Sequence, residues 1–190
     1  MSYKKLFKMP NAVSITGRTS SITNSFVNGI IPTIKPSESE IIEALAILGM
    51  SDKSICCSYC GESYTEWDHL RPLVINKKPT GYISEIHNLV PSCGKCNQSK
   101  GNKRWDEWIF SDAPLSPKSR KVIDIRKRVL ALKRYESWKT PTKLDFESIV
   151  GVEVWTKHWD NCRQIENQMK ESQKLAAKIS MKIATAFRKL

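Results

Sequence analysis

Four of the six cysteines in this 190-residue chain have a spacing that is typical of metal binding. They form two Cys-x-x-Cys pairs, Cys57 with Cys60 and Cys93 with Cys96. Four thiolates in such pairs suit a tetrahedral Zn²⁺ ion. Because the sulfurs fill every coordination position, the sequence predicts a structural role for the ion. Of the other two cysteines, Cys162 is expected to be a small core residue.

A second group of polar residues lies between and just after the cysteine pairs. Asp68 and His69 are adjacent, and Asn97 follows Cys96 directly. A carboxylate and an amide carbonyl are hard oxygen ligands, so Asp68 and Asn97 are candidate ligands of a catalytic Mg²⁺ or Mn²⁺ ion. On an extended backbone the side chains of Asp68 and His69 diverge. The neutral imidazole of His69 could then take a proton from water at physiological pH.

The stretch from residue 57 to 103 resembles the HNH, or ββα-metal, nuclease family. The resemblance is carried by Asp68-His69, by Asn88-Leu89-Val90-Pro91 and by Cys93-Gly94-Lys95-Cys96-Asn97-Gln98-Ser99-Lys100-Gly101. It implies that His69 is the general base, that Asp68 and Asn97 bind the catalytic metal, and that Asn88 holds the ring of His69. It also implies hydrolysis of phosphodiester bonds to 5′-phosphate and 3′-hydroxyl ends. Many members have His where this chain has Asn97, and the change favours Mg²⁺ over a transition metal.

The positive charge of the chain is concentrated beside this stretch. The formal net charge is +12, and residues 94–143 carry 14 Lys and Arg against 5 Asp and Glu. A local surplus of this size favours a polyanionic partner, because each cation that neutralises a phosphate releases counterions. The candidate contacts to the nucleic-acid backbone are Lys95, Lys100, Lys103 and Arg104.

Membrane and secreted classes do not fit the sequence. No apolar run approaches the roughly 20 residues that a membrane helix needs. The basic start of the chain is not followed by the apolar segment of a secretory signal. We therefore expect a cytoplasmic protein without a membrane span and without a disulfide framework.

The elements that must position these residues can be predicted in part. Ser37 and Glu40 form a capping box, so a helix should begin there and stop at Gly49. Apolar residues at 70–75 and 82–86 predict two paired strands around a turn at 76–81. A helix should then run from about residue 94 to 108 or 109 and carry Asn97.

The flanking regions are less distinctive. Residues 1–36 are interpreted as an arm that contains short strands at 26–27 and 30–31 or that orders on binding. Helices are predicted at about 117–139 and 150–189. Apolar residues recur along the second helix at alternating spacings of four and three, which fits either a coiled-coil seam between subunits or a helix packed on its own domain.

The expected fold is α+β, with a zinc-bound ββα-metal core, an N-terminal arm and helix, and a helical C-terminal extension. The expected domains are the arm and helix at 1–50, the nuclease core at 51–110 and a basic helical region at 111–190.

The sequence thus predicts a metal-dependent endonuclease for double-stranded DNA, of the type II restriction kind that reads a short site as a homodimer. A nonspecific or nicking defence or phage nuclease is one alternative. A noncatalytic zinc-dependent DNA-binding module is another, and an RNA substrate also remains open.

Overall fold

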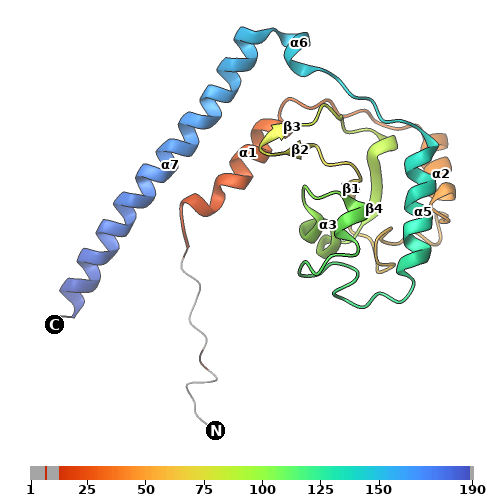
Figure 1. Ribbon diagram of the computed structural model, residues 1–190, viewed down its shortest axis with the longest axis horizontal. Coiled ribbons are helices and arrows are strands. Elements are labelled where there is room, and N and C mark those ends of the chain that lie inside the picture. Colours follow the sequence, from red (N-terminus) through yellow and green to blue (C-terminus); the bar gives the residue numbers. More distant parts are fainter. Residues whose placement is uncertain (1–6, 8–12, 189–190) are drawn as a thin grey trace. The chain divides into compact units, whose positions relative to one another are not determined.

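The computed structural model describes Phe7 and residues 13–188, and the chain divides into two compact units. One unit is formed by residues 27–149. The other is formed by the described residues of 1–26 and 150–190. Figure 1 shows the course of the chain through both units.

An antiparallel strand pair lies at the centre of the 27–149 unit. Strand β1 (Glu66–His69) pairs with β4 (Leu89–Ser92), so that Asp68 lies opposite Val90. Helix α3 (Gly94–Lys100) follows β4 directly and lies near both strands (Figure 1). This mixture of helices with a small sheet confirms the predicted α+β class.

The two strands that the sequence predicted at 70–75 and 82–86 are wrong. The central pair uses the segments on either side of them, and only β2 (Val74–Ile75) and β3 (Lys78–Pro79) form a separate short hairpin. Leu70 is fully buried, and its backbone N–H donates to Asn88 O at 2.8 Å. The apolar run therefore reflects a loop that is buried against the core rather than a strand. The 3-10 helix η3 (Ile86–Asn88) leads into β4.

The predicted helix from residue 94 to 109 is interrupted. Helix α3 ends where Gly101 adopts a φ of 50°, and α4 (Trp105–Trp108) is a separate short helix. A residue without a Cβ takes up this conformation at little cost, which explains the stop. The loop in between carries Lys103 and Arg104.

Two longer helices flank the strands. Helix α2 (Glu38–Ile47) has the predicted capping box between Ser37 and Glu40, and Gly49 follows it at a φ of 74°. Helix α5 (Ile125–Trp138) begins later than predicted. Residues 117–124 form turns instead, because Lys121 has a φ of 56° and interrupts any helix there.

The core of this unit joins both helices to the strands. Tyr135 of α5 is fully buried, and its hydroxyl donates to Leu89 O at 2.7 Å. The core therefore includes residues on both sides of the domain boundaries that the sequence predicted at positions 50 and 110. Its buried members include Ala44, Leu45, Leu48, Leu70, Ile86, Val90, Trp105, Trp108, Ile109, Leu132 and Tyr135.

The other unit pairs the N-terminal helical segment with a long helix. It contains η2 (Thr16–Arg18), most of α1 (Thr19–Asn28), the end of α6 (Phe146–Val150) and α7 (Val152–Phe187). Ile15 N–H donates to Gln173 Oε1 at 2.7 Å, and Thr23 Oγ1 donates to Glu166 Oε1 at 3.0 Å. The two segments therefore run antiparallel.

The outcome for the flanking predictions is mixed. The long helix and the burial of Cys162 are confirmed. The short strands that were one interpretation of residues 26–27 and 30–31 do not form, because residues 26–27 are helical and residues 30–31 lie in the turn after that helix. Residues 1–6 and 8–12 of the predicted arm lie outside the described residues. Among the helices of the described chain, none combines the length and the apolar character that a membrane crossing requires.

Candidate functional site

The four predicted zinc ligands come together in one buried cluster. Cys57 and Cys60 lie on the turn before β1, whereas Cys93 and Cys96 lie at the start of α3. Their sulfurs all lie within 4.8 Å of one another, and the Sγ atoms of Cys60 and Cys93 are 3.7 Å apart. Zn–S bonds of about 2.3 Å at tetrahedral angles place neighbouring sulfurs about 3.8 Å apart. The cluster is therefore positioned to bind a metal ion, with the geometry of a zinc site.

The backbone of the first cysteine pair explains how the turn forms. Gly61 N–H donates to Cys57 O at 2.8 Å, and Gly61 has a φ of 80°. Ser58 N–H donates to Pro91 O at 2.8 Å, which ties the turn to β4. The turn and the end of β4 thus hold their cysteines at fixed separation.

Two arginines lie against cysteine sulfurs, and nothing in the sequence indicates either contact. Arg120 Nη1 donates to Cys96 Sγ at 3.4 Å, and Arg128 Nη1 donates to Cys56 Sγ at 3.3 Å. Four thiolates around Zn²⁺ carry a net charge of about −2, as ligand counting shows. Arg120 therefore offsets part of the negative charge of the loaded site. Cys56 is not part of the four-sulfur cluster.

Asp68 is buried and has two partners. The Tyr59 hydroxyl donates to Asp68 Oδ2 at 2.7 Å, and the Lys100 ammonium lies 3.0 Å from the same oxygen. Burial raises the pKa of Asp68, and the positive charge of Lys100 opposes that shift. The carboxylate is thus held in one orientation between β1, α3 and the cysteine turn.

Lys100 does not occupy the surface position that the sequence predicted for it. Lys100 is only 1% exposed, and its ammonium also donates to His69 O at 2.9 Å and to Gly101 O at 3.2 Å. A lysine with these partners cannot contact a nucleic-acid backbone from the surface. Lys100 instead joins α3 to β1 at Asp68 and His69, the two residues that were expected to be catalytic.

His69 lies next to Asp68 on β1 and is partly exposed. Its Nε2 is 2.8 Å from Ser84 Oγ, so Ser84 fixes the plane of the ring. Burial lowers the pKa of His69 to about 4, and the charge of Lys100 adds to the effect. The imidazole is therefore neutral at pH 7, which a general base requires.

Asn88 binds the backbone beside His69 rather than its ring. Its Oδ1 accepts from Arg71 N–H at 2.8 Å, and its Nδ2 donates to Arg71 O at 3.0 Å. Asn88 is fully buried, so both bonds are protected from water. Asn88 thus fixes the path of the chain just after His69, and the hydrogen-bond partner of the ring is Ser84.

The remaining predicted residues lie on or just after α3. Asn97 is partly buried, three residues before Lys100 and therefore on the same side of the helix. Lys95 is exposed, with Glu62 Oε2 at 3.5 Å. Lys103 Nζ donates to Ser99 O at 2.9 Å, and Arg104 pairs with Asp106 at 2.7 Å.

Asp68 and Asn97 both offer oxygens of the kind that Mg²⁺ prefers. An ionised carboxylate has about four lone-pair positions. Tyr59 and Lys100 contact Oδ2, whereas the one contact of Oδ1 with the described residues is the longer one of 3.3 Å with Lys100. Within the described part of the chain, the Asn97 side chain makes no hydrogen bond. Both residues therefore retain an oxygen that can bind a hard cation.

Comparison with known proteins agrees with this geometry. The family model described as HNH endonuclease matches residues 57–103, a segment that includes all four cysteines, Asp68, His69, Asn88 and Asn97. No curated protein and no solved structure matched the chain. Residues 57–103 are therefore an HNH endonuclease domain.

Proposed function

We propose that the chain is a metal-dependent endonuclease that hydrolyses phosphodiester bonds in double-stranded DNA. The observation that carries the proposal is the partly exposed imidazole of His69 beside the buried carboxylate of Asp68, on the strand next to the four-cysteine cluster. A base and a metal-binding carboxylate are the two groups that this hydrolysis needs close together.

His69 would remove a proton from the attacking water. In the tautomer that carries its hydrogen on Nε2, the ring donates to Ser84 Oγ and keeps its lone pair on Nδ1, which would then accept the proton. A phosphodiester bound nearby brings negative charge to the ring. That charge raises the pKa of His69 and makes the imidazole a stronger base when substrate is present.

The other residues hold this base and the ion in place. Asp68 and Asn97 would bind Mg²⁺ or Mn²⁺, which stabilises the charge on the phosphoryl oxygen and on the leaving 3′ oxygen. Tyr59 and Lys100 orient Asp68. Lys100 also holds the backbone carbonyl of His69, and Asn88 holds the backbone of Arg71 two residues later. The products would carry 5′-phosphate and 3′-hydroxyl ends.

Cleavage of supercoiled plasmid with Mg²⁺ or Mn²⁺ tests the proposal. We expect His69→Ala to slow cleavage by about 10²–10⁴-fold, the usual contribution of general base catalysis. His158→Ala, in the other unit, is the matched control and should cleave at the wild-type rate. Zinc content measured on each variant shows whether the fold is retained. If His69→Ala binds zinc and still cleaves at the wild-type rate, the proposed mechanism is wrong.

We further propose that the enzyme is of the restriction type and acts as a homodimer. Exposed apolar residues of α7, namely Ile179, Ile183 and Phe187, support contact between two subunits. A two-fold dimer would place one active site on each strand of a palindromic sequence. Discrete fragments with fixed ends from a defined plasmid are expected. A smear would indicate a nonspecific nuclease, and faster cleavage of RNA in a parallel reaction would change the substrate.

A further inference from the structure

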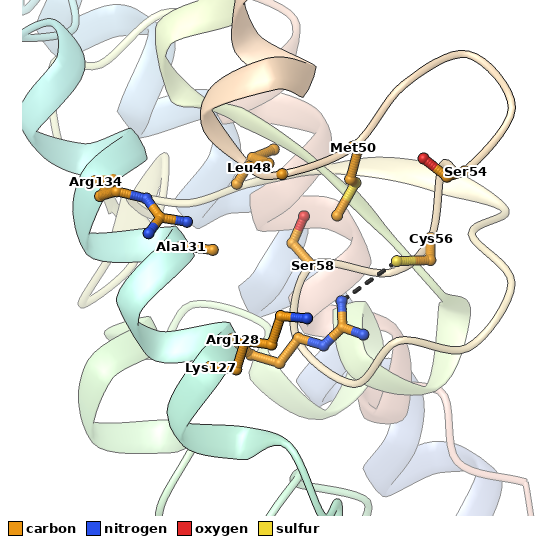
Figure 2. Close-up of a pocket in the computed structure, with 10 residues that line it drawn as sticks. Leu48, Met50, Ser54, Cys56, Ser58, Lys127, Arg128, Ala131 and Arg134 are labelled. Atoms are coloured by element: carbon orange, nitrogen blue, oxygen red, sulfur yellow. Dashed lines mark hydrogen bonds between the residues drawn. The ribbon is translucent and has the colours of Figure 1, made fainter.

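A basic pocket lies on the 27–149 unit, apart from the residues assigned to catalysis. It has a volume of about 150 Å³ and lies between α5 and the segment 48–58. Figure 2 shows Lys127, Arg128 and Arg134 extending from α5, with Cys56 and Ser58 on the facing segment. None of the ten lining residues is acidic.

The sequence of α5 explains why the pocket is open and positive. Lys127, Ala131 and Arg134 are spaced by four and three residues, so they share one face of the helix. The small side chain of Ala131 leaves room between the two longer ones. Within the described residues, neither Lys127 nor Arg134 forms an ion pair, whereas Arg128 is held by Asp124 at 2.9 Å.

Ser58 gives the pocket an unused hydrogen-bonding group. It is 2% exposed, and its hydroxyl has no hydrogen-bond partner within the described residues. Buried hydroxyls are nearly always paired, so one that lacks a partner in a basic pocket indicates a ligand with acceptor atoms. Its backbone N–H donates to Pro91 O at 2.8 Å, which fixes the residue between Cys57 and Cys60.

We propose that this pocket binds a phosphate group of the nucleic-acid backbone, outside the site of cleavage. This inference rests on the proposed function, which provides the nucleic acid as the polyanionic partner. A phosphate offers oxygens to the Lys127 ammonium, the Arg134 guanidinium and the Ser58 hydroxyl. Leu48 and Met50 provide apolar surface for the adjoining sugar. Both cations have exposed side chains, so they are accessible to a phosphate.

The test measures binding of a labelled DNA duplex to the full chain by fluorescence anisotropy at several salt concentrations. His69→Ala is present throughout, so that the duplex is not cut. The pocket variant is Lys127→Gln with Arg134→Gln. The matched control is Arg126→Gln with Lys133→Gln, two exposed residues of α5 that do not line the pocket.

The pocket variant should bind about tenfold more weakly and lose about 0.9 from the slope of log affinity against log salt, the value for one neutralised phosphate. The control, with the same loss of charge, should lose less than about threefold. Ser58→Ala should weaken binding without changing the slope, because the hydroxyl is neutral. Equal losses in the pocket and control variants would overturn the proposal.

A second measurement distinguishes the backbone phosphate from a free anion. Backbone amide shifts at Ser58 and Ala131 are followed by NMR during titration with inorganic phosphate and, separately, with the duplex. Shifts with both ligands support the proposal, whereas shifts with inorganic phosphate alone would reject nucleic acid as its source. If wild-type protein never cuts DNA but pocket variants still lose binding, the catalytic proposal fails and this one stands. If wild-type protein cuts DNA but the pocket variants keep their affinity, the phosphate-pocket proposal fails and the catalytic one stands.

Discussion

Replacement of Lys100 by methionine should destabilise the 27–149 unit strongly. The ammonium of Lys100 is buried, lies 3.0 Å from Asp68 Oδ2 and donates to two backbone carbonyls. Methionine keeps the length of the side chain but removes the charge. Among the residues that the structure describes, Asp68 would then keep only the Tyr59 hydroxyl as a partner inside the protein.

The expected cost follows from the burial of both charges. The side chains of Lys100 and Asp68 are 1% and 7% exposed, so solvent cannot replace the lost cation. Breaking a buried ion pair by removing one partner typically costs about 3–5 kcal/mol. Lys95→Met on the same helix is the matched control. Its side chain is 60% exposed and lies 3.5 Å from Glu62, so its loss should cost under about 1 kcal/mol.

Urea unfolding of the zinc-bound protein at pH 7, followed by tryptophan fluorescence, measures both changes. The double variant Asp68→Asn with Lys100→Met should lose less stability than the sum of the single variants, because both charges are then absent. The Lys100→Met loss should shrink as pH falls through the raised pKa of Asp68, since a protonated carboxyl needs no cation. A loss no larger than that of Lys95→Met would refute the reasoning.

Three further outcomes are expected. Removing the metal with a chelator, or replacing Cys93 by Ser, should abolish binding of one zinc ion per chain and unfold the 27–149 unit, as metal analysis and circular dichroism would show. Asn88→Ala leaves the two Arg71 backbone groups unpaired, so it should cost about 2–6 kcal/mol in the same urea assay, from about 1–3 kcal/mol per buried group. The His69 ring should stay neutral down to about pH 4 in an NMR titration, because burial and Lys100 disfavour its charged form; a midpoint near 6.5 would contradict this.

The zinc-site residues were predictable from sequence because spacing alone specifies them. A Cys-x-x-Cys pair brings two sulfurs to one turn, and two such pairs leave few other arrangements. The capping box of α2 was predictable for a similar reason, since both of its partners lie within one helical turn. The strands were not, because the apolar run after His69 fits a buried loop as well as it fits a strand.

Long-range partners could not be predicted in the same way. Lys100 looks like an ordinary basic residue of an exposed helix, and its burial depends on the way α3 lies on β1. One signal was available: Lys100 follows Cys96 by four residues, so it shares the face that points inward. Tyr59 could be placed inside the cysteine turn but not beside Asp68, and nothing in the sequence linked Arg120 to Cys96.

The hairpin of β2 and β3 has a consequence for how such a domain can diversify. Its two-residue turn at Asn76 and Lys77 projects from a segment that is tied down at both ends, by Asn88 at Arg71 and by the contact between Ser84 and His69. Lengthening a loop whose ends are already fixed costs little, about 0.6 kcal/mol per doubling. New sequence can therefore be inserted at this tip without moving the four cysteines or His69, which makes it the place where a longer loop should be tolerated best.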